Sequence, residues 1–374
     1  MGLNKRRFIM YLPIMKNRNE ELRVINNMSY LFSDSMIPLI EIIRDEYDVK
    51  YRTDESTGEY IYEEKPGSKR RKRIKLEPTE EDIITLEKIE QRLNGKKGFI
   101  DFFRFNEGEY DNKVFKGIEL SFTLSRDFNY YKKRLLQIGN FDKLYPVISI
   151  KDGFNISEQD LINLTTELKR DNSSIAIRIT DLYLEDYTEF IEDYLTENDF
   201  VMLDIRNQHV DSKFIELEEF KDLDTDATKI LLNSPRSRNY KNGDYEDCEF
   251  TEKIENKVAI KYAEYEFDGF GDFGGLKDDL PTDAGGNGTG AALGLMYLKE
   301  KNAFYSMVNY DTKMGVRGFE FVRSKVIDKL HLLDSDSDCV AVKRIKDMEG
   351  RYGNWGTWSN LTLTRYIHQQ AKNK

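Results

Sequence analysis

Eight short apolar runs recur along the chain at an interval that fits one strand and one helix per repeat. The runs cover residues 8–16, 36–42, 98–105, 144–151, 174–180, 200–206, 229–236 and 266–273. Between polar residues near their ends, Lys16 to Glu41 is 25 residues and Arg178 to Asp204 is 26. A parallel strand can follow another only after a crossover of about this length. The apolar residues are continuous within each run, which is typical of strands covered on both faces.

One gap is longer than the others, because Glu41 to Asp101 is 60 residues. Removal of about 32 residues restores the period, and residues 45–78 have the pattern of an inserted β-hairpin with a basic run. Amphipathic stretches such as 157–170 separate the other runs. The sequence therefore predicts an α/β fold, a (β/α)8 TIM-barrel-like domain with this hairpin inserted. A doubly wound open sheet is the alternative, because strand count does not establish closure.

The regular alternation of strand and helix patterns ends after Asp278. Residues 293–298 and 303–310 resemble a hairpin, and helical patterns follow near 318–332 and 357–371. We expect residues 279–374 to form a C-terminal α+β appendage packed on the barrel, with residues 1–374 making a single domain.

Charged residues stand at or near the ends of the runs, where barrel enzymes place their active sites. The candidate catalytic residues are Glu41, Asp101, Asp204 and Asp272, and the candidate ligand-binding residues are Lys16, Lys151, Arg178, Arg206 and Arg236. Carboxylates facing cations could bind a divalent metal with a phosphate, or perform general acid–base chemistry. Equally, Glu41 or Asp204 could pair with Arg178 and satisfy the buried charges without any catalysis. The sequence identifies no metal ligands or cofactor.

The inserted hairpin holds the one dense basic run of the chain. Its candidate residues for contact with nucleic acid or a partner are Lys69, Arg70, Arg71, Lys72 and Arg73. Nearby glutamates could balance these charges on a solvated arm, and no aromatic residue interrupts the run. With 57 basic and 68 acidic residues the net charge is −11, which disfavours a nucleic-acid-coating protein.

Two further observations indicate the cellular compartment of the protein. The chain contains two cysteines, so a disulfide framework is not expected. The apolar stretch 8–15 is too short to span a bilayer, and no 18-residue apolar run occurs elsewhere. We therefore expect a cytoplasmic protein.

Several short motifs occur in a recognisable order. YLPIMK ends at Lys16, IPLIEI contains Glu41, and PVIS and IRI precede the strand of Asp204; FGDFGG and GRYGNWGTWSNLTLTRYIHQ follow. Together they resemble the phage beta-protein family and its bacterial relatives over nearly the whole chain. The resemblance implies a barrel-like fold and a place in phages or bacterial anti-phage islands, where some relatives are encoded beside a nuclease-like protein. Glu41, Asp204 and Asp272 match the family's recurring acidic positions, but the resemblance assigns no catalytic residue.

Two functions compete. The first is a cytoplasmic component of an anti-phage defence system that works with a protein partner, such as a nuclease, the barrel serving recognition or regulation. The second is a metal-assisted hydrolase or lyase that acts on a phosphorylated or nucleotide-like ligand at the barrel rim. Direct nucleic-acid binding through the basic run is the least favoured. Whether the protein is an enzyme stays open at this point.

Overall fold

Eight parallel strands close into a barrel in the computed structural model, which describes residues 10–63, 71–105, 119–279, 290–333 and 338–372. The barrel strands are β1 (Met10–Lys16), β2 (Leu39–Ile42), β5 (Gly98–Phe102), β6 (Leu144–Ile150), β7 (Ala176–Thr180), β8 (Phe200–Asp204), β9 (Thr228–Asn233) and β11 (Gly269–Asp272). Their order is β1-β11-β9-β8-β7-β6-β5-β2, and β2 pairs with β1 to close the ring. The predicted (β/α)8 TIM-barrel-like fold is confirmed, and the open sheet is excluded.

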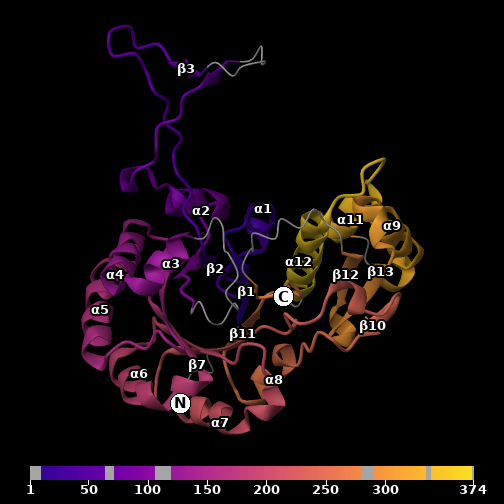
Figure 1. Ribbon diagram of the computed structural model, residues 1–374. Helices are drawn as coiled ribbons and strands as arrows, with labels where there is room; N and C mark the ends of the chain where they lie inside the picture. The colour runs from indigo at the N-terminus through magenta and orange to yellow at the C-terminus, as the bar shows by residue number, and fades with distance from the viewer. Residues whose placement is uncertain (1–9, 64–70, 106–118, 280–289, 334–337, 373–374) are drawn as a thin grey trace.

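The helices of the barrel lie around its outside (Figure 1). They are α1 (Asn19–Met28), α2 (Thr85–Leu93), α3 (Glu119–Arg126), α4 (Phe128–Leu136), α5 (Glu158–Asp171), α6 (Thr188–Tyr194), α7 (Phe214–Asp222) and α8 (Val258–Glu264). Helix α5 shows why the sequence forms them: Ser157 caps its first turn by accepting a hydrogen bond from the Asp160 amide, and Leu161, Leu164 and Leu168 share one buried face. None of the helices in the described ranges is long and apolar enough to cross a membrane.

The C-terminal α+β appendage packs beside the barrel. Its antiparallel sheet has the order β10-β13-β12, formed by Glu249–Thr251, Ala303–Asn309 and Ala292–Leu298. Its helices are α9 (Gly318–Asp328), α10 (Leu330–Leu333), α11 (Val340–Lys346) and α12 (Trp355–Ala371). Helix α12 joins the two parts, because Leu363 and Ile367 belong to the barrel core while Trp358 and Leu361 belong to the appendage core.

The inserted hairpin forms an arm that projects away from the barrel (Figure 1). We call residues 45–63 and 71–84 the arm. Strand β3 (Tyr62–Glu63) pairs with β4 (Lys72–Arg73), and further bridges join the two sides as far back as Tyr47 and Ile83. The inserted hairpin of the predicted fold is thus confirmed, whereas the division of the chain into parts at residues 45–78 and 279–374 stays a prediction.

Strand β11 closes the barrel against β1 by means of glycines that let the two backbones approach. A Cβ atom on Gly271 would lie 2.7 Å from the carbonyl oxygen of Leu12 and 2.6 Å from a methyl carbon of Leu232. Real side chains do not reach such separations, so any larger residue here would force the two strands apart.

We therefore predict that Gly271→Ala lowers the free energy of unfolding by about 1–3 kcal/mol, the usual cost of overpacking a core. Gly243→Ala is the matched control, because the nearest heavy atom to its added Cβ lies at 3.6 Å. Urea denaturation of both variants measures the difference. Equal stability of the two would contradict this view of barrel closure.

Candidate functional site

Arg178 stands at the centre of the barrel mouth and binds three carboxylates from three other strands. Its Nε and Nη2 donate to Oδ2 of Asp204 at 2.9 and 2.6 Å. Its Nη1 donates to Oε1 of Glu41 at 2.7 Å and to Oδ2 of Asp101 at 2.9 Å. All four side chains are at most 5% exposed, so these ion pairs are buried.

Lys16 forms a second centre beside the first. Its Nζ pairs with Glu41, which thereby bridges Lys16 and Arg178, and donates to Oδ1 of Asp278 at 2.7 Å. The other oxygen of Asp278 lies 3.0 Å from Arg206 and 3.0 Å from Arg238. Register explains the alignment, because Lys16 stands opposite Glu41 and Glu41 opposite Asp101 in neighbouring strands.

We call these eight residues the rim network. Its four cations are Lys16, Arg178, Arg206 and Arg238, and its four carboxylates are Glu41, Asp101, Asp204 and Asp278. Formal charges therefore cancel within the network. Burial acts to raise the pKa of Glu41, but Lys16 and Arg178 outweigh it and hold that pKa below its usual value. Burial also acts to raise the pKa of Asp278, but the charges of Lys16, Arg206 and Arg238 hold that pKa well below its usual range.

Little room is left for a ligand inside the network. The cavity beside Asp101, Arg178, Asp204 and Arg206 has a volume of about 10 Å³, enough for roughly one water molecule. Ser149 fills one side and donates to Asp101 at 2.7 Å. Within the described residues, no group of three or more His, Cys, Asp or Glu side chains is placed to hold a metal ion. A divalent metal stays a hypothesis from the sequence.

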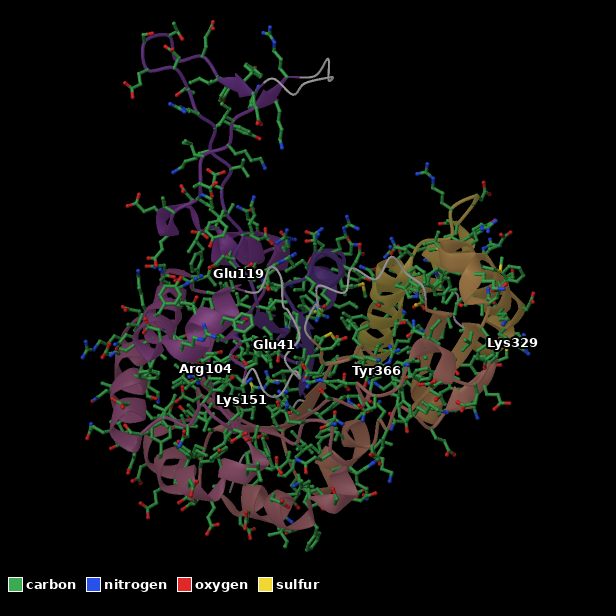
Figure 2. All side chains as sticks on the ribbon, viewed as in Figure 1. Glu41, Arg104, Glu119, Lys151, Lys329 and Tyr366 are labelled. Carbon is green, nitrogen blue, oxygen red and sulfur yellow. The ribbon has the colours of Figure 1, made fainter. Side chains whose placement is uncertain are left out.

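Three predicted site residues lie outside this network. Asp272 accepts hydrogen bonds from Tyr11 at 3.2 Å and from Tyr366 of α12 at 2.6 Å. Arg236 lies between the barrel and the appendage, where it binds Tyr245 and Asn242. Lys151 lies with its Nζ 4.0 Å from the centre of the Phe103 ring. Figure 2 shows Glu41 and Lys151 toward the barrel and Tyr366 on α12.

The basic run is divided by the limits of the structure. Lys69 and Arg70 lie outside the described residues, whereas Arg71, Lys72 and Arg73 are exposed on the arm. The Arg73 guanidinium lies 4.1 Å from the ring centre of Tyr60 and 5.6 Å from that of Tyr51. Two tyrosines that precede β3 thus bring aromatic rings to the basic run, which contains none itself. The catalytic, ligand-binding and partner-binding roles of all these residues stay predictions.

Sequence reasoning missed Asp278 and Arg238, which complete the rim network. Asp278 lies six residues beyond the end of β11, and Arg238 lies five residues beyond the end of β9. A search of strand ends alone cannot find such loop residues. A wider search for charged residues in the loops that follow the strands would have included both.

The fold and the charges at its mouth define the chain as a (β/α)8 barrel protein with a buried, neutral ion network. The family model described as Beta protein matches residues 11–372. The chain therefore belongs to the Beta protein family, as its sequence motifs predicted. No curated protein matches it.

We predict that Arg178→Met lowers the free energy of unfolding by about 3–5 kcal/mol, because three buried carboxylates lose their shared partner. Arg23→Met is the control: Arg23 is 68% exposed and pairs with Glu20, and its loss should cost less than about 1 kcal/mol. Chemical denaturation of both variants measures the two costs. A similarly small loss of unfolding free energy in both variants would contradict the prediction and would mean that the network contributes little to stability.

A pH dependence follows from Asp272. Burial raises its pKa to about 6, although bonds from Tyr366, the Gly274 amide and Tyr11 act to lower it. The folded state then binds this proton more tightly than the unfolded state, whose pKa is about 4. Protonation should therefore add stability as the pH falls from about 7 through 6 toward 4, by up to about 3 kcal/mol.

Asp272→Asn removes this contribution, so the difference in stability between wild type and variant should change over that pH range. Asp211→Asn is the control, since Asp211 has a pKa lowered by its bond to Lys257 and titrates below the range. Denaturation at closely spaced pH values gives both differences. A pH-independent difference for Asp272→Asn would refute the raised pKa.

Proposed function

We propose that the protein is a cytoplasmic component of a bacterial anti-phage defence system that acts together with a partner protein, such as a nuclease. In this proposal the barrel serves recognition or regulation, and the arm contacts the partner. The setting is what the resemblance to phage beta proteins and their bacterial relatives implies, and the chain belongs to the Beta protein family. The projecting arm is the observation that carries the proposed interaction.

The arm is built as a surface rather than as part of a core. Val49, Tyr60 and Tyr62 are 47%, 44% and 44% exposed, and Lys72 and Arg73 are exposed beside them. Isolated two-stranded hairpins are marginally stable in water. The projecting part of the arm is therefore not expected to stabilise the barrel, and we assign it a role in binding. Tyrosine and arginine are the residue types that most often dominate protein interfaces.

The base of the arm is fixed, which gives its tip a defined direction. Arg134 of α4 forms a bidentate pair with Asp45, with both nitrogen–oxygen distances at 2.8 Å. Both side chains are buried, at 1% and 3% exposure. The Glu46 amide donates to Thr85 at the start of α2. A rigid base lowers the entropy lost when a partner binds the tip.

The alternative, a metal-assisted hydrolase or lyase acting on a phosphorylated or nucleotide-like ligand at the rim, has less support. Its proposed carboxylates Glu41, Asp101 and Asp204 already bind Arg178, and Asp272 lies apart from them. A substrate would have to displace these buried pairs before it could reach a carboxylate. Binding through an existing surface requires no such rearrangement.

The test combines co-expression with the neighbouring genes and neutralisation of the arm. The variant Arg71→Gln, Lys72→Gln, Arg73→Gln should lose the co-purified partner and the protection against phage in a plaquing assay. The matched control removes three cations elsewhere, at Lys97, Lys257 and Lys261, whose side chains are 38%, 51% and 34% exposed, and should keep both activities. Thermal unfolding of both variants shows that the fold is retained.

Two results would contradict the proposal. Full protection by the protein alone, without any neighbouring gene, would exclude a required partner. Retention of the partner and of protection by the arm variant would exclude the arm as the contact.

A further inference from the structure

A cleft of about 520 Å³ lies between the barrel mouth and the appendage. Its walls come from the start of α1, the residues after β11 and the first turns of α12, and Arg44 and Arg236 also line it. A smaller pocket of about 90 Å³ adjoins it and shares Arg236 and Leu276, but is lined chiefly by apolar and aromatic side chains, including Trp355. The volume of the cleft lies within the range of small-molecule sites.

Arg236 is buried at this cleft without an opposite charge. It is 8% exposed and donates to the Tyr245 hydroxyl at 2.9 Å, the Gly275 carbonyl at 3.1 Å and the Asn242 side-chain oxygen at 3.1 Å. All three acceptors are neutral. Among the described residues, the Arg236 guanidinium forms no ion pair with a carboxylate. Burial of a cation is costly unless a counter-charge accompanies it.

Two more cations line the same cleft without a carboxylate partner among the described residues. Lys277 donates to the Arg238 carbonyl at 3.2 Å, and Arg44 donates to the Asn19 side chain at 2.8 Å. Burial, and after it the nearby charge of Arg236, lower the pKa of Lys277, while the carboxylates of Asp279 and Asp244 act to raise it. The buried Nε of Arg18, a fourth residue of the wall, has no hydrogen-bond partner.

The carboxylates at the cleft are already engaged with other groups. Glu20 pairs with Arg23 at 2.5 Å, and Glu21 accepts the Lys16 amide at 2.6 Å. The Asp279 carboxylate lies 3.6 Å from Arg18 and is half exposed. Among the described residues none of them forms an ion pair with Arg44, Arg236 or Lys277, and the charge of Asp279 acts on Lys277 from a greater distance. An anionic ligand with several oxygens would satisfy all three cations at once.

We propose that this cleft binds a phosphorylated small molecule of nucleotide size. Its phosphate groups contact Arg44, Arg236 and Lys277, and its apolar or aromatic part enters the adjoining pocket beside Trp355. The ligand then touches the barrel and α12 together, so binding fastens the appendage to the barrel. This inference is independent of the proposed partner contact, which concerns the arm.

The chain has a built-in reporter for the test. It contains two tryptophans, Trp355 and Trp358, and both line the adjoining pocket. Titration of the full-length protein with ADP, GDP and pyrophosphate, followed by calorimetry and by tryptophan emission, measures affinity and location together. We expect at least one nucleotide to bind, to change the tryptophan emission, and to bind more tightly than pyrophosphate.

Arg44→Gln and Lys277→Gln each remove one cation whose single described hydrogen bond is to a neutral oxygen, so the fold should persist. We expect each to weaken nucleotide binding about tenfold or more, the usual effect of losing a charge-assisted hydrogen bond. Lys261→Gln on α8 is the control with the same charge change away from the cleft, and should bind as the wild type does.

Failure of all three compounds to bind the wild-type protein at millimolar concentration would overturn the inference. Nucleotide affinity unchanged in both Arg44→Gln and Lys277→Gln would place the ligand elsewhere and overturn it too. Pyrophosphate binding as tight as that of the nucleotides would refute the role given to the pocket beside Trp355.

Discussion

The rest of the structure depends on the ion pairs that Arg178 makes inside the barrel mouth. A guanidinium buried at this depth is tolerable because Glu41, Asp101 and Asp204 reach it from three other strands. Glu41 also pairs with Lys16, and Lys16 in turn pairs with Asp278, so the positions of these side chains depend on one another. Each strand must hold its register for the charges to meet. The network therefore specifies how the strands close and, at the same time, occupies the place where barrel enzymes bind substrate.

The fold could be predicted because its signal is periodic. Seven of the eight apolar runs contain a whole barrel strand, and the run 229–236 covers all of β9 except Thr228, since a parallel strand with both faces covered leaves a continuous apolar run. Strand β10 was missed because three residues, of which Glu249 is exposed, carry no such signal. Closure itself could not be derived, because it depends on the pairing of β1 with β11 and on the small size of Gly269 and Gly271.

The site could be predicted in part. Strand geometry explains which of the predicted residues meet in the rim network and which do not. Side chains alternate between the two faces of a strand, so Lys16 points into the barrel whereas Tyr11 points outward. Asp272 bonds to Tyr11 and lies on that outer face, beside α12. Its neighbour Gly271 takes the inward position, near Leu12. Residue type and spacing located the charged ends of the strands, but only the register decides which of them meet. Arg44 and Lys277, whose surroundings come from distant segments, had no sequence signal that distinguishes them from other surface cations.

The central claim, that the rim charges form one buried and mutually dependent network, is tested most directly by a double-mutant cycle between Arg178 and Asp204. The free energies of unfolding of Arg178→Met, Asp204→Asn and the double variant give the coupling between the two side chains. A buried pair with two hydrogen bonds, at 2.9 and 2.6 Å, predicts a coupling above about 1 kcal/mol. Additive effects, with a coupling near zero, would mean that the two residues act separately and would contradict the account.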